Sequence, residues 1–296
     1  MTKISIIIPV YNTQEYLEQC LNSVLNQTLK DIEVMCIDDC SKDSSLEILH
    51  QFSNKDNRVK VYHFDEPKSA LQARKTGVLN ATGEYIMFLD ADDYYIHNDF
   101  VLRAYNMIVE HNADIIEFGI KYINQNGERE NLVANKTFVI NNNHVGNLSV
   151  MFYDNLIKFM PWTKILKRSI VETRPYDTSR TFEDIRTTPY WVYNASKIII
   201  ANTIEINYRA AQGSIIRENP NDTRLGTVAA IASLFEDFST NKDILKAMYD
   251  RCLVDLRTMT MVDSDSDYFK EMSKLNTKML SYIYPDDYEK RTFNLE

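Results

Sequence analysis

Tyr85-Ile86-Met87-Phe88-Leu89-Asp90-Ala91-Asp92-Asp93 passes from five largely apolar residues to three carboxylates with no turn residue between them. We expect the first five residues to form a buried strand and the acids to lie at its carboxyl end. Side chains i and i+2 of a strand share a face, so Asp90 and Asp92 would point the same way if the extended backbone continues. Paired carboxylates suit Mg²⁺ or Mn²⁺, which complete their coordination with water and phosphate oxygens. A solvated acidic turn is the commoner origin of an isolated Asp-x-Asp, so the rest of the chain must decide.

Three further strand-like runs precede this stretch, at residues 4–10, 32–37 and 58–63, and each leads into a segment with helical features. Residues 17–25 carry an apolar stripe at helical spacing, and Ser44 with Glu47 has the spacing of a capping box. Strands that alternate with helices pair in parallel through right-handed crossovers, and ligands bind at the carboxyl ends of such strands. We therefore expect the site to be built from four loops, residues 9–13, 38–41, 65–70 and 90–94.

Beyond the fourth strand the alternation continues briefly and then breaks. We expect a helix over 98–111, a strand over 114–120, and a hairpin or long loop over 124–147, which holds eight asparagines. Later segments predict two strands (197–201 and 203–208) and three helices (228–238, 243–262 and 268–283). We interpret the apolar stripe of the last helix as a packing face, with membrane or dimer contact as the less favoured alternative. The predicted domains are residues 1–216 and a helical extension over 217–296.

The composition and net charge of the chain argue against several classes of function. The 296 residues are 44% hydrophobic and 25% charged, which is typical of a globular chain. A formal net charge of −9 argues against a nucleic-acid partner, which requires a basic face. The four cysteines show no Cys-x-x-Cys pair, so no zinc site is expected. No apolar run has the length of roughly 18 residues that a membrane span needs. We expect a soluble cytoplasmic protein that can still work at the inner face of the cytoplasmic membrane.

Several motifs extend the pattern of the opening stretch along the chain. They are Ile6-Ile7-Ile8-Pro9-Val10-Tyr11-Asn12, Ser23-Val24-Leu25-Asn26-Gln27-Thr28, Ile37-Asp38-Asp39-Cys40-Ser41, Ala73-Arg74-Lys75-Thr76-Gly77, Ala81-Thr82-Gly83-Glu84 before the opening stretch, and Phe182-Glu183-Asp184. In their combined order they resemble the inverting family 2 glycosyltransferases of the GT-A fold, over about the first 215 residues. The resemblance implies an α/β fold with a Rossmann-like, mostly parallel central sheet flanked by helices.

The resemblance also implies a UDP-sugar donor and residues that bind it. Pro9, Tyr11 and Asp39, with the neighbouring Asp38, would hold the uracil and ribose, and Arg74 would approach the nucleotide or its phosphates. Asp90-Ala91-Asp92 would lie at the nucleotide sugar as the Asp-x-Asp element. Its carboxylates would bind Mn²⁺ or Mg²⁺, with Asp92 as the direct ligand.

A second group of implied residues carries the reaction. Asp184 would be the catalytic base that activates a hydroxyl of a glycan or lipid-linked acceptor, with Glu183 as the first alternative and Asp177 as the second. Arg209 and Ser214 would help to bind the diphosphate. An acid pair such as Glu183-Asp184 is also common at helix N-termini without any catalytic role. Association into a homo-oligomer through the C-terminal helices is a further open alternative.

Three positions depart from the family pattern, and all of them concern the nucleotide pocket. Cys40 stands where glycine is usual, Lys75 where asparagine is usual, and Pro67-Lys68 replaces a common Gly-Gly. The Gln-x-x-Arg-Trp element of processive synthases is absent from the sequence, which indicates transfer of a single sugar.

Three other classes of protein use similar acids. A sugar-1-phosphate nucleotidyltransferase is the second candidate, but it would have a glycine-rich loop where residues 11–13 read Tyr-Asn-Thr. A phosphatase would carry Asp-x-Asp on its first strand instead of its fourth. A receiver-like module could use Asp38 and Asp39 for Mg²⁺, but it would not need residues 120–296. The sequence therefore favours a glycosyltransferase.

Overall fold

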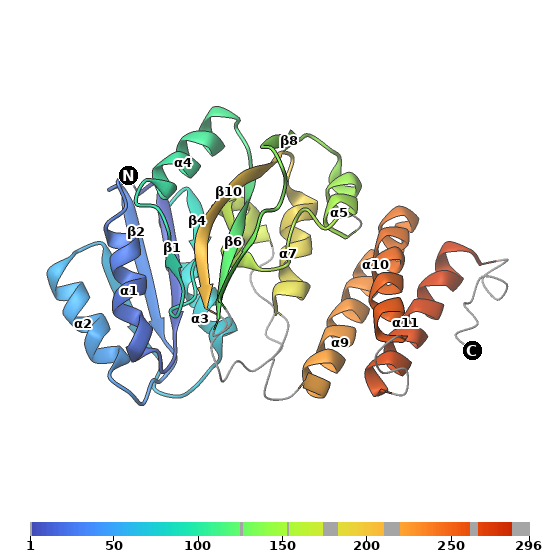
Figure 1. Ribbon diagram of the computed structural model, residues 1–296, viewed down its shortest axis with the longest axis horizontal. Helices are drawn as coiled ribbons and strands as arrows, with labels where there is room; N and C mark the ends of the chain where they lie inside the picture. The colour runs from blue at the N-terminus through green and yellow to red at the C-terminus, as the bar shows by residue number, and fades with distance from the viewer. Residues whose placement is uncertain are drawn as a thin grey trace.

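One mixed sheet forms the centre of the molecule (Figure 1). The computed structural model describes residues 2–124, 127–152, 154–173, 183–209, 220–260 and 266–285. The strands in these ranges are β1 (Ile4–Val10), β2 (Ile32–Asp38), β3 (Val59–His63), β4 (Tyr85–Phe88), β5 (Tyr94–Tyr95), β6 (Ile115–Asn124), β7 (Gly127–Asn131), β8 (Phe138–Ile140), β9 (Lys164–Lys167) and β10 (Ile198–Arg209). Their order is β3-β2-β1-β4-β9-β6-β10-β5, with β7 paired to β6 and β8 to β10.

Helices connect and flank the strands. In the described ranges they are α1 (Gln14–Leu25), α2 (Ser45–Lys55), α3 (Ala70–Asn80), α4 (Phe100–Glu110), α5 (His144–Phe152), the 3-10 turn η1 (Pro161–Thr163), α6 (Arg168–Thr173), α7 (Glu183–Asn194), α9 (Pro220–Phe238), α10 (Lys242–Thr260) and α11 (Asp267–Ile283). The predicted α/β class, with a mostly parallel central sheet flanked by helices, is confirmed.

The first four strands form the parallel half of the sheet, as their apolar sequences predict. β1 pairs in parallel with β2 on one side and β4 on the other, so Ile4 lies opposite both Ile32 and Tyr85. Every residue of β2 is buried, which is typical of a strand covered on both faces. A Cβ on Gly77 of α3 would overlap Ile7 of β1, so glycine is needed where this helix packs on the sheet. This packing fixes the carboxyl ends of β1, β2 and β4 side by side.

The other half of the sheet differs from the sequence prediction. β9, which was not predicted, lies antiparallel between β4 and β6. The two strands expected over 197–208 are one strand, β10, whose register shifts between Ile200 and Ile204. The hairpin expected in residues 124–147 is found, because β7 pairs antiparallel with β6, and the same segment also contains β8 and the start of α5. The capping box expected at Ser44 is wrong, because that side chain makes no capping hydrogen bond; Asp43 accepts from the Ser45 amide instead.

The three C-terminal helices pack on the α/β part through α5 and α7, with α10 against α5 and α9 against α7 (Figure 1). The predicted apolar stripe of α11 is buried, which confirms that it is a packing face: Phe269, Met272, Leu275, Met279 and Ile283. Helix α9 begins at Pro220, eight residues before the expected start. Among the helices in the described ranges, none combines the length and apolarity that crossing a membrane requires.

Candidate active site

The loops after β1 and β2 are joined to each other by hydrogen bonds. The amide of Asn12 donates to Ser41 Oγ over 3.0 Å, and the amide of Lys42 donates to Asn12 Oδ1 over 2.7 Å. The amide of Thr13 donates to Ser45 Oγ at 2.9 Å. Tyr11 projects from this pair of loops and is 53% exposed, the most exposed tyrosine among the large hydrophobic side chains of the described residues. The joined loops therefore present an aromatic ring at the carboxyl ends of the strands, where the family resemblance implies that the base of a nucleotide binds.

Asp38 and Asp39 are both buried and both hold loops. Asp38 Oδ2 accepts from the amide of Ser41 and lies 2.8 Å from His63 Nδ1. The two oxygens of Asp39 accept from the amides of Lys68 and Ser69, at 2.5 and 2.9 Å. These bonds attach the segment before α3 to the end of β2. A carboxylate oxygen accepts more than one hydrogen bond, so Asp39 keeps acceptor capacity for a ribose hydroxyl.

Cys40, which stands where the family pattern has glycine, has the backbone conformation that glycine favours. Its φ of 60° lies in the left-handed region, where a glycine is free of strain and other residues are not. The thiol is buried, with Sγ 3.6 Å from the carbonyl of Asp65, and Lys42 Nζ lies 3.1 Å from the same sulfur. The turn after the acid pair therefore has the backbone that the family glycine would give, with a side chain packed into the loop.

The acid cluster at the end of β4 is a turn and not a continuation of the strand. The strand ends at Phe88, and the amide of Asp93 donates to the carbonyl of Asp90 over 3.0 Å. The condition under which Asp90 and Asp92 would share a strand face, an extended backbone through the acids, is therefore not met. Asp93 nevertheless differs from the other two acids, as expected. Asp90 and Asp92 are partly exposed, whereas Asp93 is fully buried.

Electrostatics in this turn favour a positive partner. Asp90 Oδ1 accepts from Arg74 Nη2 over 2.7 Å. Burial and the nearby charge of Asp90 raise the pKa of Asp92 to about 6. Burial, Asp90 and Asp92 raise the pKa of Asp93 well above its usual value, although its Oδ1 accepts from the Arg209 amide at 2.8 Å. Ionised carboxylates so close together repel each other, and a cation would relieve that repulsion.

The residues present fit a divalent cation in part. Asp90 and Asp92 are oxygen ligands of the kind that Mg²⁺ and Mn²⁺ use, often one or two at a time beside phosphate oxygens. One oxygen of Asp90 already faces Arg74. In the described residues no group of three or more His, Cys, Asp or Glu side chains is arranged to hold a metal. Any metal here would rely on one or two carboxylates together with water and substrate oxygens.

Arg209 joins the acid cluster from the end of β10. Its Nη1 donates to the carbonyl of Asp92 and its Nη2 to Gln19 Oε1. The guanidinium lies over two rings, 4.9 Å from the centroid of Tyr16 and 4.7 Å from that of Tyr94. The sequence predicted Arg209 but not its neighbours on α1 and β5, because only the folded sheet brings these segments together.

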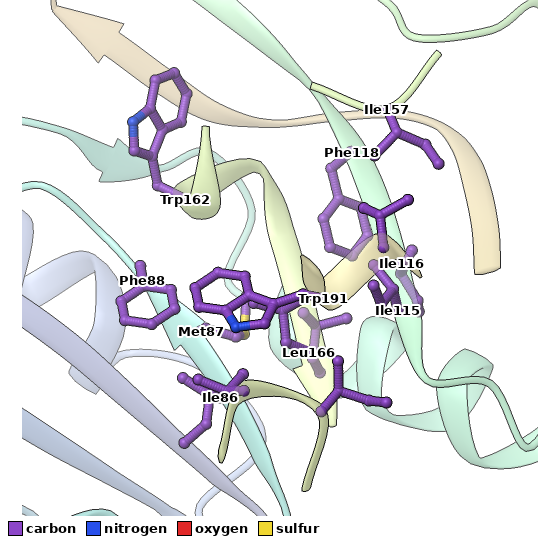
Figure 2. Close-up of a cluster of buried hydrophobic side chains, with 14 of the residues drawn as sticks. Ile86, Met87, Phe88, Ile115, Ile116, Phe118, Ile157, Trp162, Leu166 and Trp191 are labelled. Carbon is purple, nitrogen blue, oxygen red and sulfur yellow. The ribbon is translucent and has the colours of Figure 1, made fainter. Parts of the chain in front are cut away.

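Asp184 lies in the first turn of α7, where its Oδ1 accepts from the amide of Ile185 over 2.8 Å. The helix is anchored at Trp191, whose ring stacks on Phe88 of β4 with a centroid distance of 6.0 Å. Figure 2 shows Trp191 among side chains of β4 and β9. The Glu183 side chain, Asp177 and Ser214 lie outside the part of the chain that can be described.

Comparison with known proteins identifies the family of this chain. The model of glycosyl transferase family 2 matches residues 5–173. The glycosyltransferase GlyG of Streptococcus pneumoniae is 30% identical over 223 residues, which are 72% of this chain and 73% of that protein. The poly(ribitol-phosphate) beta-glucosyltransferase of Bacillus spizizenii is 43% identical over 128 residues, but these are 42% of this chain and only 20% of that protein.

Solved structures agree in fold. The structure of S. aureus TarS 1-349 in complex with UDP-GlcNAc superposes with a TM-score of 0.74 at 20% identity. The alignment covers 95% of this chain and 81% of that one. Because the family model spans more than half of the chain and GlyG aligns over most of its length, this chain belongs to glycosyl transferase family 2.

Proposed function

We propose that the protein transfers a single sugar from a UDP-sugar to a hydroxyl of a glycan or lipid-linked acceptor, with inversion at the anomeric carbon. The observation that carries this proposal is the meeting of Arg74, Asp90, Asp92 and Arg209 at the carboxyl ends of the strands. Acids and arginines at that position suit a nucleoside diphosphate and its charge-balancing cation. TarS, solved with UDP-GlcNAc, supports a UDP-sugar as the donor. Family membership argues against the nucleotidyltransferase alternative.

The proposed chemistry is a single displacement. Asp184 accepts the proton of the acceptor hydroxyl, and the hydroxyl oxygen forms a bond to the anomeric carbon. The bond from that carbon to the diphosphate breaks, and UDP leaves with the electron pair. Arg209, whose guanidinium lies 4.9 and 4.7 Å from the ring centroids of two tyrosines, would stabilise the negative charge on the leaving diphosphate. Mn²⁺ or Mg²⁺ bound by Asp92 and Asp90 would supply further neutralisation of that charge.

The biological role is proposed from the relatives. Two of them act on poly(ribitol-phosphate) by name, one in Bacillus spizizenii and one in Staphylococcus aureus. We propose that this protein likewise helps to build a bacterial surface glycan, at the cytoplasmic face of the membrane, where a nucleotide sugar can meet a lipid-linked acceptor. Deletion of the gene should alter surface polysaccharide or lipo-oligosaccharide profiles, and unchanged profiles would argue against this role.

A thermal-shift panel tests the donor and the metal together. We expect UDP and one UDP-sugar to raise the melting temperature in the presence of Mn²⁺, because a ligand that binds only the folded state stabilises it by mass action. GDP-mannose and ADP-glucose serve as matched nucleotide controls. Calorimetric titration of UDP with and without Mn²⁺ then measures metal dependence. The absence of UDP binding would refute the donor assignment, and equal affinity in both titrations would refute the metal site.

A further inference from the structure

The segment before η1 is held by hydrogen bonds from two separate elements. Lys164 Nζ, on β9, donates to the carbonyls of Lys158 and Met160 over 2.6 and 2.8 Å. The carbonyl between them, that of Phe159, accepts from Thr188 Oγ1 of α7 over 2.5 Å. Three consecutive carbonyls therefore tie this segment to the sheet on one side and to α7 on the other.

A buried ion pair fixes the lysine in this arrangement. Lys164 and Glu117 are both fully buried, with Nζ and Oε2 2.8 Å apart. The hydroxyl of Thr163 donates to the other oxygen of Glu117 over 2.7 Å. Burial lowers the pKa of Lys164 and raises that of Glu117, and the charge of each partner opposes the shift of the other. Because an unpaired charge at this depth would be costly, the lysine and the carbonyls it holds have one favoured arrangement.

This arrangement reaches the first turns of α7. Thr188 lies one helical turn after Asp184, on the same side of the helix. Asp184 is close enough to Lys164 for its charge to act on the lysine pKa. One turn further on, Trp191 is anchored on Phe88 (Figure 2). Helix α7 is therefore held by the Thr188 hydroxyl, which bonds to the segment before η1, and by the Trp191 ring, which stacks on β4.

We propose that Thr188 is a positioning residue for sugar transfer, which acts by fixing the first turn of α7 and hence the direction of the Asp184 carboxylate. Lys164 and Glu117 contribute to this positioning. Lys164, held by Glu117, bonds to the carbonyls on either side of Phe159 and so helps to fix the Phe159 carbonyl to which Thr188 donates. The proposal rests on the proposed function, in which Asp184 is the base. A base must lie within hydrogen-bond reach of the acceptor hydroxyl, so a small rotation of this turn lowers turnover.

Thr188→Val tests the proposal, because it keeps the shape of the side chain and removes the donor. The chain supplies a matched control in Thr187, the preceding residue, which is also fully buried but whose Oγ1 has no hydrogen-bond partner among the described residues. We expect Thr188→Val to lower kcat by roughly tenfold or more, with the donor KM and the UDP Kd unchanged. Thr187→Val and the hydroxyl-retaining Thr188→Ser should stay within about threefold of wild type.

A double-mutant cycle separates positioning from a general effect on folding. In the Asp184→Asn background, Thr188→Val should cause no further loss of kcat, since the two residues act through one group. An equal loss in both backgrounds would overturn the proposal. So would an equal loss from Thr187→Val and Thr188→Val. If the valine variant does not fold, Thr188→Ala takes its place.

Hydrogen exchange supplies a readout that does not depend on turnover. We expect faster exchange of the amides of residues 187 and 188, which donate to carbonyls of the first turn of α7, in Thr188→Val than in Thr187→Val, because only the first loses a bond to the Phe159 carbonyl. Unchanged exchange would refute the role of Thr188 even if the protein transfers sugar as proposed. Faster exchange in a protein that uses no nucleotide sugar would instead refute the proposed function and leave the structural part intact.

Discussion

Replacing Glu33 by glutamine should lower the stability of the parallel half of the sheet. Glu33 is 3% exposed, and its Oε1 accepts from Ser5 Oγ, Thr82 N and Thr82 Oγ1 at 2.6, 2.6 and 2.9 Å. Its other oxygen pairs with Lys60. Burial alone would raise the pKa of Glu33, but these hydrogen bonds outweigh burial and lower the pKa from 4.5 to about 2. Glutamine keeps the shape but places an amide group against the Lys60 ammonium.

The size of the effect follows from the shift in pKa. A change from 4.5 to about 2 corresponds to about 3 kcal/mol of unfolding free energy at neutral pH. The folded pKa of this carboxyl is depressed, so its contribution is complete above pH 4.5 and is lost as the pH falls through about 2. At pH 3 about 1.4 kcal/mol should remain.

Urea unfolding of wild type and Glu33→Gln at pH 7 and pH 3 measures both values. Glu110→Gln, a change at an exposed glutamate on α4, is the control and should shift the unfolding free energy by less than about 0.5 kcal/mol. Equal losses in the two variants, or a loss in Glu33→Gln that does not shrink at pH 3, would refute the reasoning.

Three further predictions concern the site. Asp184→Asn should lower kcat by roughly two orders of magnitude or more while UDP affinity stays intact, and a variant that turns over normally but melts earlier would contradict the base assignment. In calorimetry with Mn²⁺, Asp92→Asn should weaken UDP binding more than Asp93→Asn does, since Asp93 is buried and its Oδ1 can still accept from the Arg209 amide; the reverse order would count against Asp92 as the metal ligand. Cys40→Gly should raise the unfolding free energy by about 1 kcal/mol by relieving a left-handed backbone, and a loss of stability in urea would show that the packed thiol matters more.

Sequence reasoning predicted the parallel half of the sheet because its signals are local. The apolar runs and helical stripes between Ile4 and Phe88 each lie within one element, and the periodicity of a segment does not depend on its partners. Parallel pairing alone predicted that Asp38, Asp39 and Asp90 lie at the same edge of the sheet, and in the fold the loop after β1 lies between them. The site loops were predictable for the same reason.

The features that the sequence did not predict depend on contacts between distant segments. β9 has only four residues, and its first, Lys164, is a charged side chain that is fully buried because Glu117 lies opposite it in the fold. No window of sequence around Lys164 contains that partner, so a strand was not predicted there. Tyr16 and Tyr94 flank Arg209 only after α1, β5 and β10 have come together.

The packing of α9 on α7 bears on how such enzymes can be recombined. Phe238, at the end of α9, lies against Tyr190 and Tyr193 on the helix that also carries Asp184, with ring centroids 5.3 and 5.4 Å apart. A chimera that takes its C-terminal helices from a relative would therefore replace Phe238 but keep the two tyrosines that it contacts. These tyrosines lie on the same helix as the proposed base. Grafts of this kind should exchange the tyrosines together with the phenylalanine, so that the new helices arrive with the surface they were selected to fit.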